Sequence, residues 1–438
     1  MEITINKNEI AGKIKPLHCI NNAPSFDDEV LFETLTEAGI PYSRLHDTFE
    51  LHYDRLVDVP NVFPDFDADE NDPASYDFAF TDVFIKNLVA AGVKPFYRLG
   101  VSIENYRAIK PYHIFPPKDY EKWARVCERI IMHYNEGWAD GFRYNIEYWE
   151  IWNEPDNFPD AKDNQMWTGT AKEYIDLYVT TAKYLKKRFP DLKIGGYGSC
   201  GFYAVLEEKA SGNAKISSRT GYFLDFFEQF LQRVKEESVP LDFFSWHSYS
   251  GVESNIKYAE YCRTKLNEYC FEKTESILNE WNPGIMERGT INDSAAVASN
   301  MLALQNSSLD MLMYYDAKAD SAYCGLYNPL YARLPVVKSK RVFCTYYVFK
   351  AFNELYKLKN QAALKCYGKD IYAVAAYDGE SGAVMITNVS DKKKAVRISG
   401  IESIESCKKI CVKGYKETPA QGNVITLLPY ETALAKFI

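Results

Sequence analysis

The sequence predicts an α/β protein in which a (β/α)8 TIM barrel is followed by a small C-terminal antiparallel β-sandwich domain. Strand-like apolar runs alternate with helix-like patterns over most of the chain, and two of these runs end in a glutamate close to a proline. Near residue 358 the pattern changes to short strands and tight turns. The 438 residues suffice for a barrel and a small second domain. We expect the barrel at residues 13–357 and the β-sandwich at 358–438, with residues 1–12 as a candidate strand of that sandwich.

The barrel prediction depends on eight strand candidates, each a short apolar or aromatic run. In chain order they are residues 15–20, 42–46, 93–99, 147–153, 192–196, 241–247, 276–280 and 310–315. Helical periodicity occupies residues 27–38, 78–91, 119–135, 171–189, 221–237, 255–269, 294–307 and 341–355. The first helix has acidic residues in its first turn and Gly39 at the C-cap position. Strict alternation of eight strands with eight helices is typical of a (β/α)8 barrel.

Two further segments need an interpretation. The loop at 57–74 is long and rich in Pro, Asp and Asn, and we expect it beside the active-site rim of the barrel. Residues 196–201 match G-x-G-x-x-G, a pattern of dinucleotide-binding loops. Such a site needs an acidic residue about 20 positions further on, and residues 217–221 contain no carboxylate. We therefore interpret this glycine-rich run as the rim after the fifth strand.

Beyond residue 357 the chain reads as a small antiparallel β domain. Strand candidates lie at 370–377, 383–388, 395–398, 408–412 and 424–428. Asp-Gly, Ser-Gly and polar turns separate them, as in a meander of short strands.

Composition narrows the class of partner. The formal net charge of −9 argues against nucleic acid or an anionic membrane as a partner. Ten cysteines without CxxC pairs or Cys/His clusters indicate neither a zinc site nor a disulfide framework. The N-terminal residues have no apolar core of a signal peptide, and no run of 18 apolar residues occurs, so we expect a cytoplasmic protein. The oligomeric state stays open, a homo-oligomer included.

Two of the strand candidates end in the same way. The fourth ends in Asn153-Glu154-Pro155, and the seventh delivers Glu280, with Pro283 shortly after it. Proline cannot donate to a sheet ladder, so each strand should stop near its glutamate. A solvated loop carboxylate is the alternative, but a charge beside a buried strand is costly unless it is used. A carboxyl pair at one rim is the arrangement on which sugar hydrolysis depends.

The remaining strand ends support an active site at this rim, because TIM-barrel sites lie at the C-terminal ends of the strands. The polar and aromatic residues there are Arg44, His46, Asp47, Asn153, Trp246, His247, Tyr249, Trp281 and Asp316. A single histidine at a strand end is more often structural than catalytic, so the set as a whole carries the inference.

These motifs resemble glycoside hydrolase family 39, the β-xylosidase and α-L-iduronidase family, within the clan of retaining enzymes built on (β/α)8 barrels. The matching pieces are residues 44–46, 92–95, 149–155, 194–196, 247–249 and 278–281. They occur in order between about residues 15 and 320, so the resemblance covers the whole barrel. Asn-Glu-Pro by itself indicates only the clan, whereas the combined set indicates the family.

The resemblance implies a role for each residue. Glu154 would be the general acid/base, protonated near neutral pH, and Glu280 the ionised nucleophile. By the same resemblance, Asn153 would bind the sugar 2-hydroxyl, and Tyr249 would hold Glu280. His46 and His247 would line the subsite of the non-reducing sugar, and Trp281 and Trp246 would form an aromatic wall. Asp47 and Asp316 would bind substrate. Arg44 would either orient the nucleophile or pair with a carboxylate inside the barrel.

The chain departs from the family pattern at places that bear on the substrate. Asn279 stands where Thr is more usual, and residues 317–325 contain no glutamate where β-xylosidases tend to place a sugar-binding one. Residues 248–250 (Ser-Tyr-Ser) offer no basic side chain for the carboxylate of an iduronide, so we expect a neutral sugar.

The resulting prediction is a retaining glycoside hydrolase without metal or cofactor. It would be exo-acting, of the β-xylosidase type, and would cleave a small oligosaccharide or glycoside by double displacement through a glycosyl-enzyme. β-Glucosidase, β-galactosidase, α-L-arabinosidase and α-L-iduronidase-like specificities on the same machinery are alternatives. A non-catalytic carbohydrate-binding barrel is the alternative from another class, and the presence of both glutamates together with Asn153 and Tyr249 counts against it.

Overall fold

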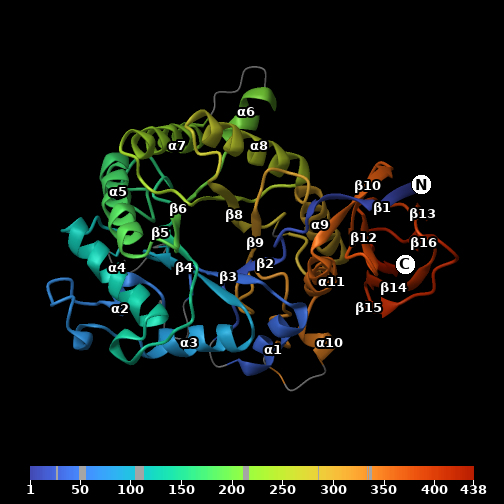
Figure 1. Cartoon of the computed structure of the whole chain (residues 1–438), viewed down its shortest axis with the longest axis horizontal. Helices are drawn as coiled ribbons and strands as arrows, with labels where there is room; N and C mark the ends of the chain where they lie inside the picture. Colours follow the sequence, from blue (N-terminus) through green and yellow to red (C-terminus); the bar gives the residue numbers. More distant parts are fainter. Residues whose placement is uncertain are drawn as a thin grey trace.

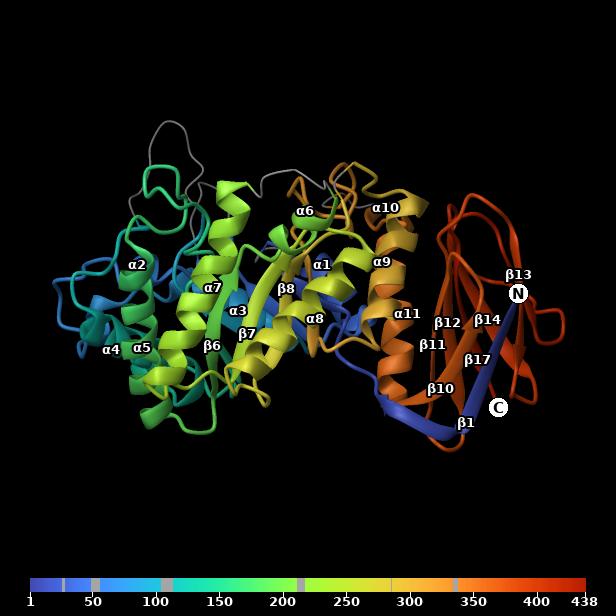
Figure 2. The same cartoon turned by 90° about the horizontal axis from the view of Figure 1, so that it is seen from above.

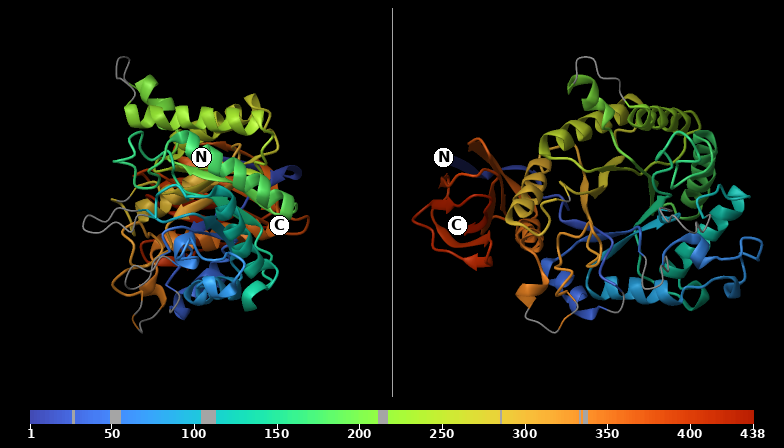
Figure 3. Two further views of the ribbon diagram at one scale, coloured as in Figure 1. Left: turned by 90° about the vertical axis from the view of Figure 1, so that its left-hand side faces the viewer. Right: turned by 180° about the vertical axis from the view of Figure 1, so that it is seen from behind.

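The structure is a computed structural model that describes residues 1–25, 28–48, 56–103, 113–210, 217–284, 286–332, 334 and 338–438. Among these residues, eight parallel strands close into a barrel in chain order (Figure 1; Figure 3, right). They are β2 (Cys19–Asn21), β3 (Tyr42–Leu45), β4 (Lys94–Leu99), β5 (Tyr148–Ile151), β6 (Lys193–Ser199), β7 (Phe243–Ser248), β8 (Glu275–Trp281) and β9 (Met311–Tyr315). Each predicted barrel strand overlaps one of them, so the predicted TIM barrel is confirmed.

Helices surround the barrel and cover the outer side of its strands (Figure 1). The long ones are α1 (Glu29–Ala38), α3 (Ala79–Ala90), α4 (Tyr120–Asn135), α5 (Ala171–Arg188), α7 (Ser218–Glu236), α8 (Val252–Glu268), α9 (Ile291–Leu304) and α11 (Cys344–Leu358). Each overlaps a predicted helix; residue 27, the predicted start of the first, lies outside the described residues. Gly39 caps α1 in the left-handed conformation, at φ 64°. Short segments in the loops are α2 (Val59–Val62), α6 (Ala204–Ala210), α10 (Lys338–Arg341), η2 (Pro73–Ser75) and η3 (Trp138–Asp140).

Beside the barrel, nine described strands form one curled sheet that docks on α9 and α11 (Figure 2). They are β1 (Glu2–Lys13), β10 (Asn360–Tyr367), β11 (Ile371–Tyr377), β12 (Gly382–Asn388), β13 (Lys394–Ser399), β14 (Ile404–Cys411), β15 (Gly414–Glu417), β16 (Val424–Leu427) and β17 (Thr432–Phe437). The N-terminal strand β1 lies between β10, to which it is antiparallel, and β13, to which it is parallel. This sheet is the predicted C-terminal β-sandwich.

Three strands of this sheet were not predicted: β10, β15 and β17. The last three residues of β10 and the last two of β15 are exposed and polar or mixed, so no apolar alternation marks these strands. β17 is buried at five of its six positions, but it contains two alanines and a lysine, which have low strand propensity. Their neighbours in the sheet therefore decide their conformation.

The loop at 57–74 lies at the C-terminal end of β4, at the rim of the barrel. Asp58 accepts a hydrogen bond from Arg98 Nη2 at 2.6 Å and from the Ser102 backbone N–H at 2.7 Å. The Val59 N–H donates to the Gly100 carbonyl. Since Ser102 and Gly100 directly follow β4, these contacts hold the start of the loop on the side where the active site is expected.

The glycine-rich run at 196–201 was predicted as a rim, and that placement is wrong for its first four residues. Residues 196–199 belong to β6, which continues to Ser199 with a bulge between Tyr197 and Ser199. At Gly195, just before the run, a Cβ atom would lie 2.2 Å from the Phe243 carbonyl oxygen, so β6 and β7 approach too closely there for a side chain. Residues 196–199 therefore belong to a strand that lies close to its neighbours in the barrel.

None of the helices in the described ranges combines the length and the apolar content that crossing a bilayer requires.

We predict that Ile3→Ala destabilises the protein by about 2–5 kcal/mol, because Ile3 is fully buried in the core of the C-terminal sheet. Urea unfolding followed by circular dichroism measures the loss. The matched control is Ile10→Ala on the same strand, where the side chain is 64% exposed and the cost should stay within about 0.5 kcal/mol. Equal costs for the two variants would contradict the placement of β1.

Candidate active site

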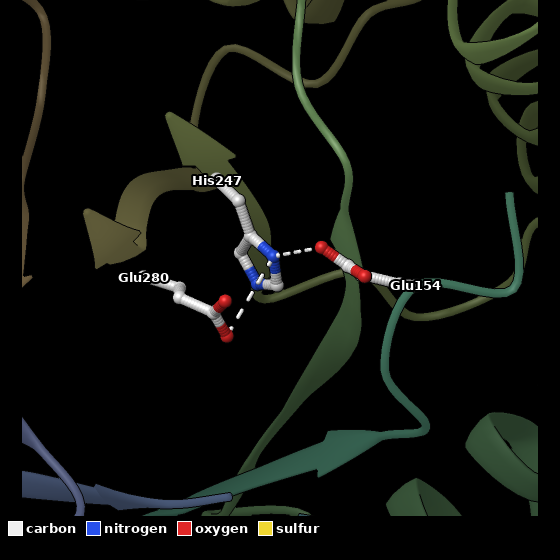
Figure 4. Close-up of side chains that lie close together, drawn as sticks. All are labelled: Glu154, His247 and Glu280. Atoms are coloured by element: carbon white, nitrogen blue, oxygen red, sulfur yellow. Dashed lines mark hydrogen bonds and ion pairs between the residues drawn. The ribbon is translucent and has the colours of Figure 1, made fainter. Parts of the chain in front are cut away.

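The barrel brings Glu154 and Glu280 together at its mouth. Glu154 follows β5, with its backbone at φ 43° and its N–H donating to the Gly198 carbonyl oxygen at 3.0 Å. Glu280 is the next-to-last residue of β8. One oxygen of each carboxylate and one ring nitrogen of His247 lie within 4.8 Å of one another (Figure 4). The two carboxylates predicted from the strand ends therefore face the same small space.

His247 lies between the two carboxylates (Figure 4). Its Nδ1 is 2.8 Å from Glu154 Oε1 and 3.8 Å from Glu280 Oε2, and its side chain is 1% exposed. The resemblance implies that His247 lines the subsite of the non-reducing sugar, which stays a prediction; in the structure its ring lies beside both glutamates.

The electrostatics of this cluster favour a charged histidine beside an ionised Glu154. Burial raises the pKa of Glu154, but the hydrogen bond and charge of His247, with the hydrogen bond of Asn157, outweigh it and hold that pKa below its ordinary value. Burial lowers the pKa of His247, and the charges of Glu280 and Glu154 outweigh it and raise that pKa. The directions of these two pKa shifts favour the proton on His247 rather than on Glu154, and the role of Glu154 as a protonated acid stays a prediction.

A buried arginine holds the nucleophile candidate. Arg44 on β3 donates from Nε to Glu150 at 2.7 Å, from Nη1 to Glu280 at 3.1 Å and from Nη2 to Asn153 Oδ1 at 2.5 Å. Its side chain is fully buried. Both interpretations that the sequence left open for Arg44 are correct, because it pairs with a carboxylate inside the barrel and orients Glu280. Since Asn153 Oδ1 accepts from Arg44, its amide nitrogen is left to donate elsewhere.

Glu150 is one of the site residues that the sequence reasoning missed. It is fully buried and accepts hydrogen bonds from Arg44, Ser245 Oγ (2.6 Å) and Asn279 Nδ2 (2.6 Å). The signal was present in the sequence, because a glutamate in the middle of a buried strand needs partners. Asn279, which departs from the family pattern, is one of those partners.

Two further residues that the sequence reasoning missed, Asn157 and Asp156, follow Glu154 in the chain, and Asn157 bonds it directly. Asn157 Nδ2 donates to Glu154 Oε2 at 2.8 Å. Asp156 is fully buried and accepts from Ser199 Oγ at 2.8 Å, and burial raises its pKa to about 7.

Gly198 permits this cluster to form. A Cβ atom at this position would lie 3.0 Å from Arg44 Nη2 and 3.1 Å from both Asn153 Oδ1 and His247 Nε2. Its φ of +65° also favours glycine. The glycine-rich strand is therefore part of the site, as the surface on which three polar side chains converge.

The remaining predicted residues lie on the other side of Glu280. Tyr249 donates its hydroxyl to Glu280 Oε1 at 2.7 Å. Asp47 accepts from the Tyr315 hydroxyl at 3.1 Å and lies 3.4 Å from His46 Nε2. Burial, and then the charge of Glu280, raise the pKa of Asp47 to about 6.

Asp316 is buried at the end of β9. It is 1% exposed and accepts from the Lys318 N–H at 3.4 Å. Burial raises its pKa to about 7.

The two tryptophans do not form the predicted aromatic wall. Trp281 and Trp246 are both fully buried. Trp281 packs against Tyr314, and Trp246 donates its Nε1 to Ser276 at 3.1 Å. Neither ring has a face open to a ligand, so their assignment as a sugar platform is corrected. The half-exposed rings near Glu280 are tyrosines.

Glu154, His247 and Glu280 are also the types of side chain that bind metal ions. Here, however, the contact between His247 and Glu154 has the length of a hydrogen bond, and Glu280 already accepts from Arg44 and Tyr249. A divalent cation would compete with the Arg44 guanidinium, so the donor set fits acid–base chemistry better than metal binding.

A (β/α)8 barrel that holds two glutamates face to face at its mouth has the arrangement of a glycoside hydrolase. The family model described as glycosyl hydrolases family 39 matches residues 27–296, and the chain belongs to that family. A β-xylosidase from Geobacillus stearothermophilus is 26% identical over 52% of this chain, and one from Caldicellulosiruptor saccharolyticus is 28% identical over 65%. The chain spans only 40% and 54% of the length of these relatives.

Solved structures share the fold over the whole chain. A glucosidase from Croceicoccus marinus aligns with a TM-score of 0.74 at 19% identity and covers 99% of this chain and 98% of its own. A family 39 β-xylosidase from Caulobacter crescentus aligns with a TM-score of 0.68 at 16% identity, covering 100% of this chain and 99% of its own. At these identities the likeness concerns the fold.

We predict that Arg44→Met destabilises the protein by about 3–5 kcal/mol at neutral pH, because it leaves Glu150 and Glu280 buried without their cation. Urea unfolding at several pH values measures the effect, and the loss should shrink toward acidic pH as the carboxyls can take up protons. Arg129→Met on α4, a half-buried arginine outside the site, is the control and should cost about 1 kcal/mol or less. A pH-independent loss in Arg44→Met would contradict the electrostatic explanation.

Proposed function

We propose that this protein is a retaining, exo-acting glycoside hydrolase of the β-xylosidase type that cleaves small neutral β-glycosides. The observation that carries the proposal is the carboxylate pair at the mouth of the barrel, with oxygens of Glu154 and Glu280 within 4.8 Å. Retaining enzymes hold their two carboxyls about 5–5.5 Å apart, whereas inverting enzymes leave about 6.5–9.5 Å for a water molecule. Membership of family 39 and the two β-xylosidase relatives support the sugar.

In the first proposed step, Glu280 attacks the anomeric carbon and the bond to the leaving oxygen breaks. Glu154 gives that oxygen a proton, and a covalent ester joins Glu280 to the sugar. Arg44 and Tyr249 hold Glu280 in place and stabilise its charge before the attack. Asn153, with its carbonyl oxygen held by Arg44, offers its amide N–H groups to the sugar 2-hydroxyl.

In the second step, Glu154 takes a proton from water as the water oxygen attacks the anomeric carbon, and the ester breaks to release Glu280. The raised pKa of His247 and the lowered pKa of Glu154 favour the proton on His247, so in this mechanism that proton has to reach Glu154 before the first step. The 2.8 Å hydrogen bond from Nδ1 to Oε1 is the direct route for it. Substrate over the site removes water from Glu154 and favours its neutral form, which drives this transfer.

The test of the proposed function is a panel of 4-nitrophenyl glycosides: β-xyloside, β-glucoside, β-galactoside, α-L-arabinosides and α-L-iduronide. NMR of the first product formed reports its anomeric configuration. We expect β-xyloside to be the best substrate and the configuration to be retained. Inversion would refute the mechanism. A folded protein that is silent on every member would favour a carbohydrate-binding role instead.

Substitution of the two glutamates should separate their roles. We predict that Glu280→Gln lowers turnover of every substrate by about 10⁴-fold or more while the melting temperature changes little. Glu154→Ala should lower kcat/KM by about 10²–10⁴-fold for alkyl glycosides, whose leaving oxygen needs a proton, and by less than about tenfold for dinitrophenyl glycosides. Equal losses on both leaving groups would mean that Glu154 is structural.

The shared proton predicts a pH effect. The pKa of His247 is raised above its ordinary value, so this histidine holds its proton to a higher pH than an ordinary imidazole, and activity should fall as the pH rises through that pKa. In His247→Asn the carboxyl of Glu154 alone has to hold the proton. Because ordinary histidine and glutamate pKa values differ by about two units, the basic limb of kcat/KM should move down by about one pH unit or more.

The control for this shift is His133→Asn, a buried histidine on α4 that bonds Asp82. It should leave the limb in place. A limb that also stays in place in His247→Asn would show that His247 does not hold the catalytic proton.

A further inference from the structure

Three tyrosine rings form the open edge of the site next to Glu280. Tyr249, whose hydroxyl bonds Glu280, has its ring centre 6.0 Å from that of Tyr323. Tyr315, whose hydroxyl bonds Asp47, lies 5.3 Å from Tyr323. Tyr323 itself is 39% exposed and Tyr249 37%. Tyr323 therefore packs against both tyrosines that contact the site, and part of its own side chain remains exposed.

Arg288, in the loop after β8, lies over the Tyr323 ring with its guanidinium carbon 4.9 Å from the ring centre. Two of its three guanidinium nitrogens, Nε and Nη2, are buried and have no hydrogen-bond acceptor within the described ranges. Its charge acts on the buried Asp316 carboxyl and tends to lower the pKa of that group, against the larger effect of burial. A buried cationic donor without an acceptor is unfavourable, and an oxygen of a bound ligand would satisfy it.

The position of this pair in the barrel decides which part of a substrate it meets. In the closed order of strands, β5, which delivers Glu154, is separated from β9 by three strands in either direction. Tyr323 follows β9 and Arg288 follows β8, so both lie across the mouth from Glu154. Because the leaving group departs on the Glu154 side, the sugar ring that becomes bound to Glu280 occupies the half of the mouth near Tyr323 and Arg288.

We propose that Tyr323 and Arg288 form a specificity-determining edge of the subsite for this sugar, the glycone. The Tyr323 ring packs against an apolar face of the sugar, and the Arg288 guanidinium donates to a hydroxyl oxygen remote from the anomeric carbon, which on a pyranose is the 4-hydroxyl or its neighbour at carbon 3. The inference rests on the proposed function. It also gives a role to the segment 317–325, which contains Tyr323 but no glutamate.

The chemistry of the pair matches that of a neutral sugar. Aromatic rings offer an apolar face to the C–H groups of a sugar, and an arginine offers several N–H donors in a fixed plane. The stacking of Arg288 on Tyr323 holds both in one orientation. This pair also supplies the aromatic surface that the buried Trp281 cannot offer.

The test measures kcat and KM of Arg288→Met, Tyr323→Ala and Tyr323→Phe on 4-nitrophenyl β-xyloside and on its 3-deoxy and 4-deoxy analogues. We expect Arg288→Met to raise KM about tenfold or more on the parent substrate, with kcat within about threefold. The effect should fall to about twofold or less on the analogue that lacks the contacted oxygen. Tyr323→Ala should raise KM as well, whereas Tyr323→Phe, which keeps the ring, should stay close to the unsubstituted protein.

Two controls keep the result interpretable. Arg129→Met removes an arginine that also lies over an aromatic ring, that of Trp138, away from the mouth, and should leave both constants unchanged. Arg288→Lys, tested on the same deoxy substrates, replaces Arg288→Met if the latter does not fold. A KM that is unchanged, or that rises equally on the parent and both deoxy analogues, overturns the subsite.

Failure of this inference is distinguishable from failure of the proposed function. If the protein hydrolyses β-xyloside while its Arg288 variants keep the original KM, only the proposed subsite is refuted. If the folded protein hydrolyses no member of the glycoside panel, both the proposed function and the glycone subsite are refuted.

Discussion

The site depends on one buried cation. Arg44 is fully enclosed and distributes its donors over Glu150 on β5, Asn153 just after β5, and Glu280 on β8. Without this charge, the carboxylates of Glu150 and Glu280 would both lose their arginine partner inside the barrel, which is strongly destabilising. The same ion network that makes the barrel mouth stable therefore orients Glu280 and fixes the amide of Asn153. Stability and catalysis share these contacts, so the polar core of the barrel is also its chemical centre.

His247 adds a second constraint, because it lies between the two carboxylates. A histidine at hydrogen-bond distance from Glu154 stabilises the ionised carboxylate of that residue. The cationic groups at the mouth divide between the carboxylates, because Arg44 bonds Glu280 and His247 bonds Glu154. Gly198 makes room for both, since any side chain there would meet all three of Arg44, Asn153 and His247.

The two halves of the mouth differ in character. On the Glu154 side, Asn157 bonds Glu154 from the loop after β5, and the neighbouring Asp156 is buried. Around Glu280 the surroundings are aromatic and acidic, with Tyr249, Tyr315 and Asp47. Tyr323 and Arg288 complete that half at the rim. A substrate lying across the mouth would contact Glu154 at one end and the tyrosine side chains at the other.

The sequence by itself determined the class of fold and the two carboxylates. Period-2 and period-3.6 patterns depend only on neighbouring residues, so all eight barrel strands and the main helices could be predicted, as could the strand-end positions of Glu154 and Glu280. Tertiary structure alone decided which strand ends meet. Glu150 looked like an ordinary strand residue until Arg44, Ser245 and Asn279 converged on it, and Trp281 looked available until packing against Tyr314 buried it. Likewise the lowered pKa of Glu154 and the raised pKa of His247 depend on burial and on charges distant in sequence, which no local pattern records.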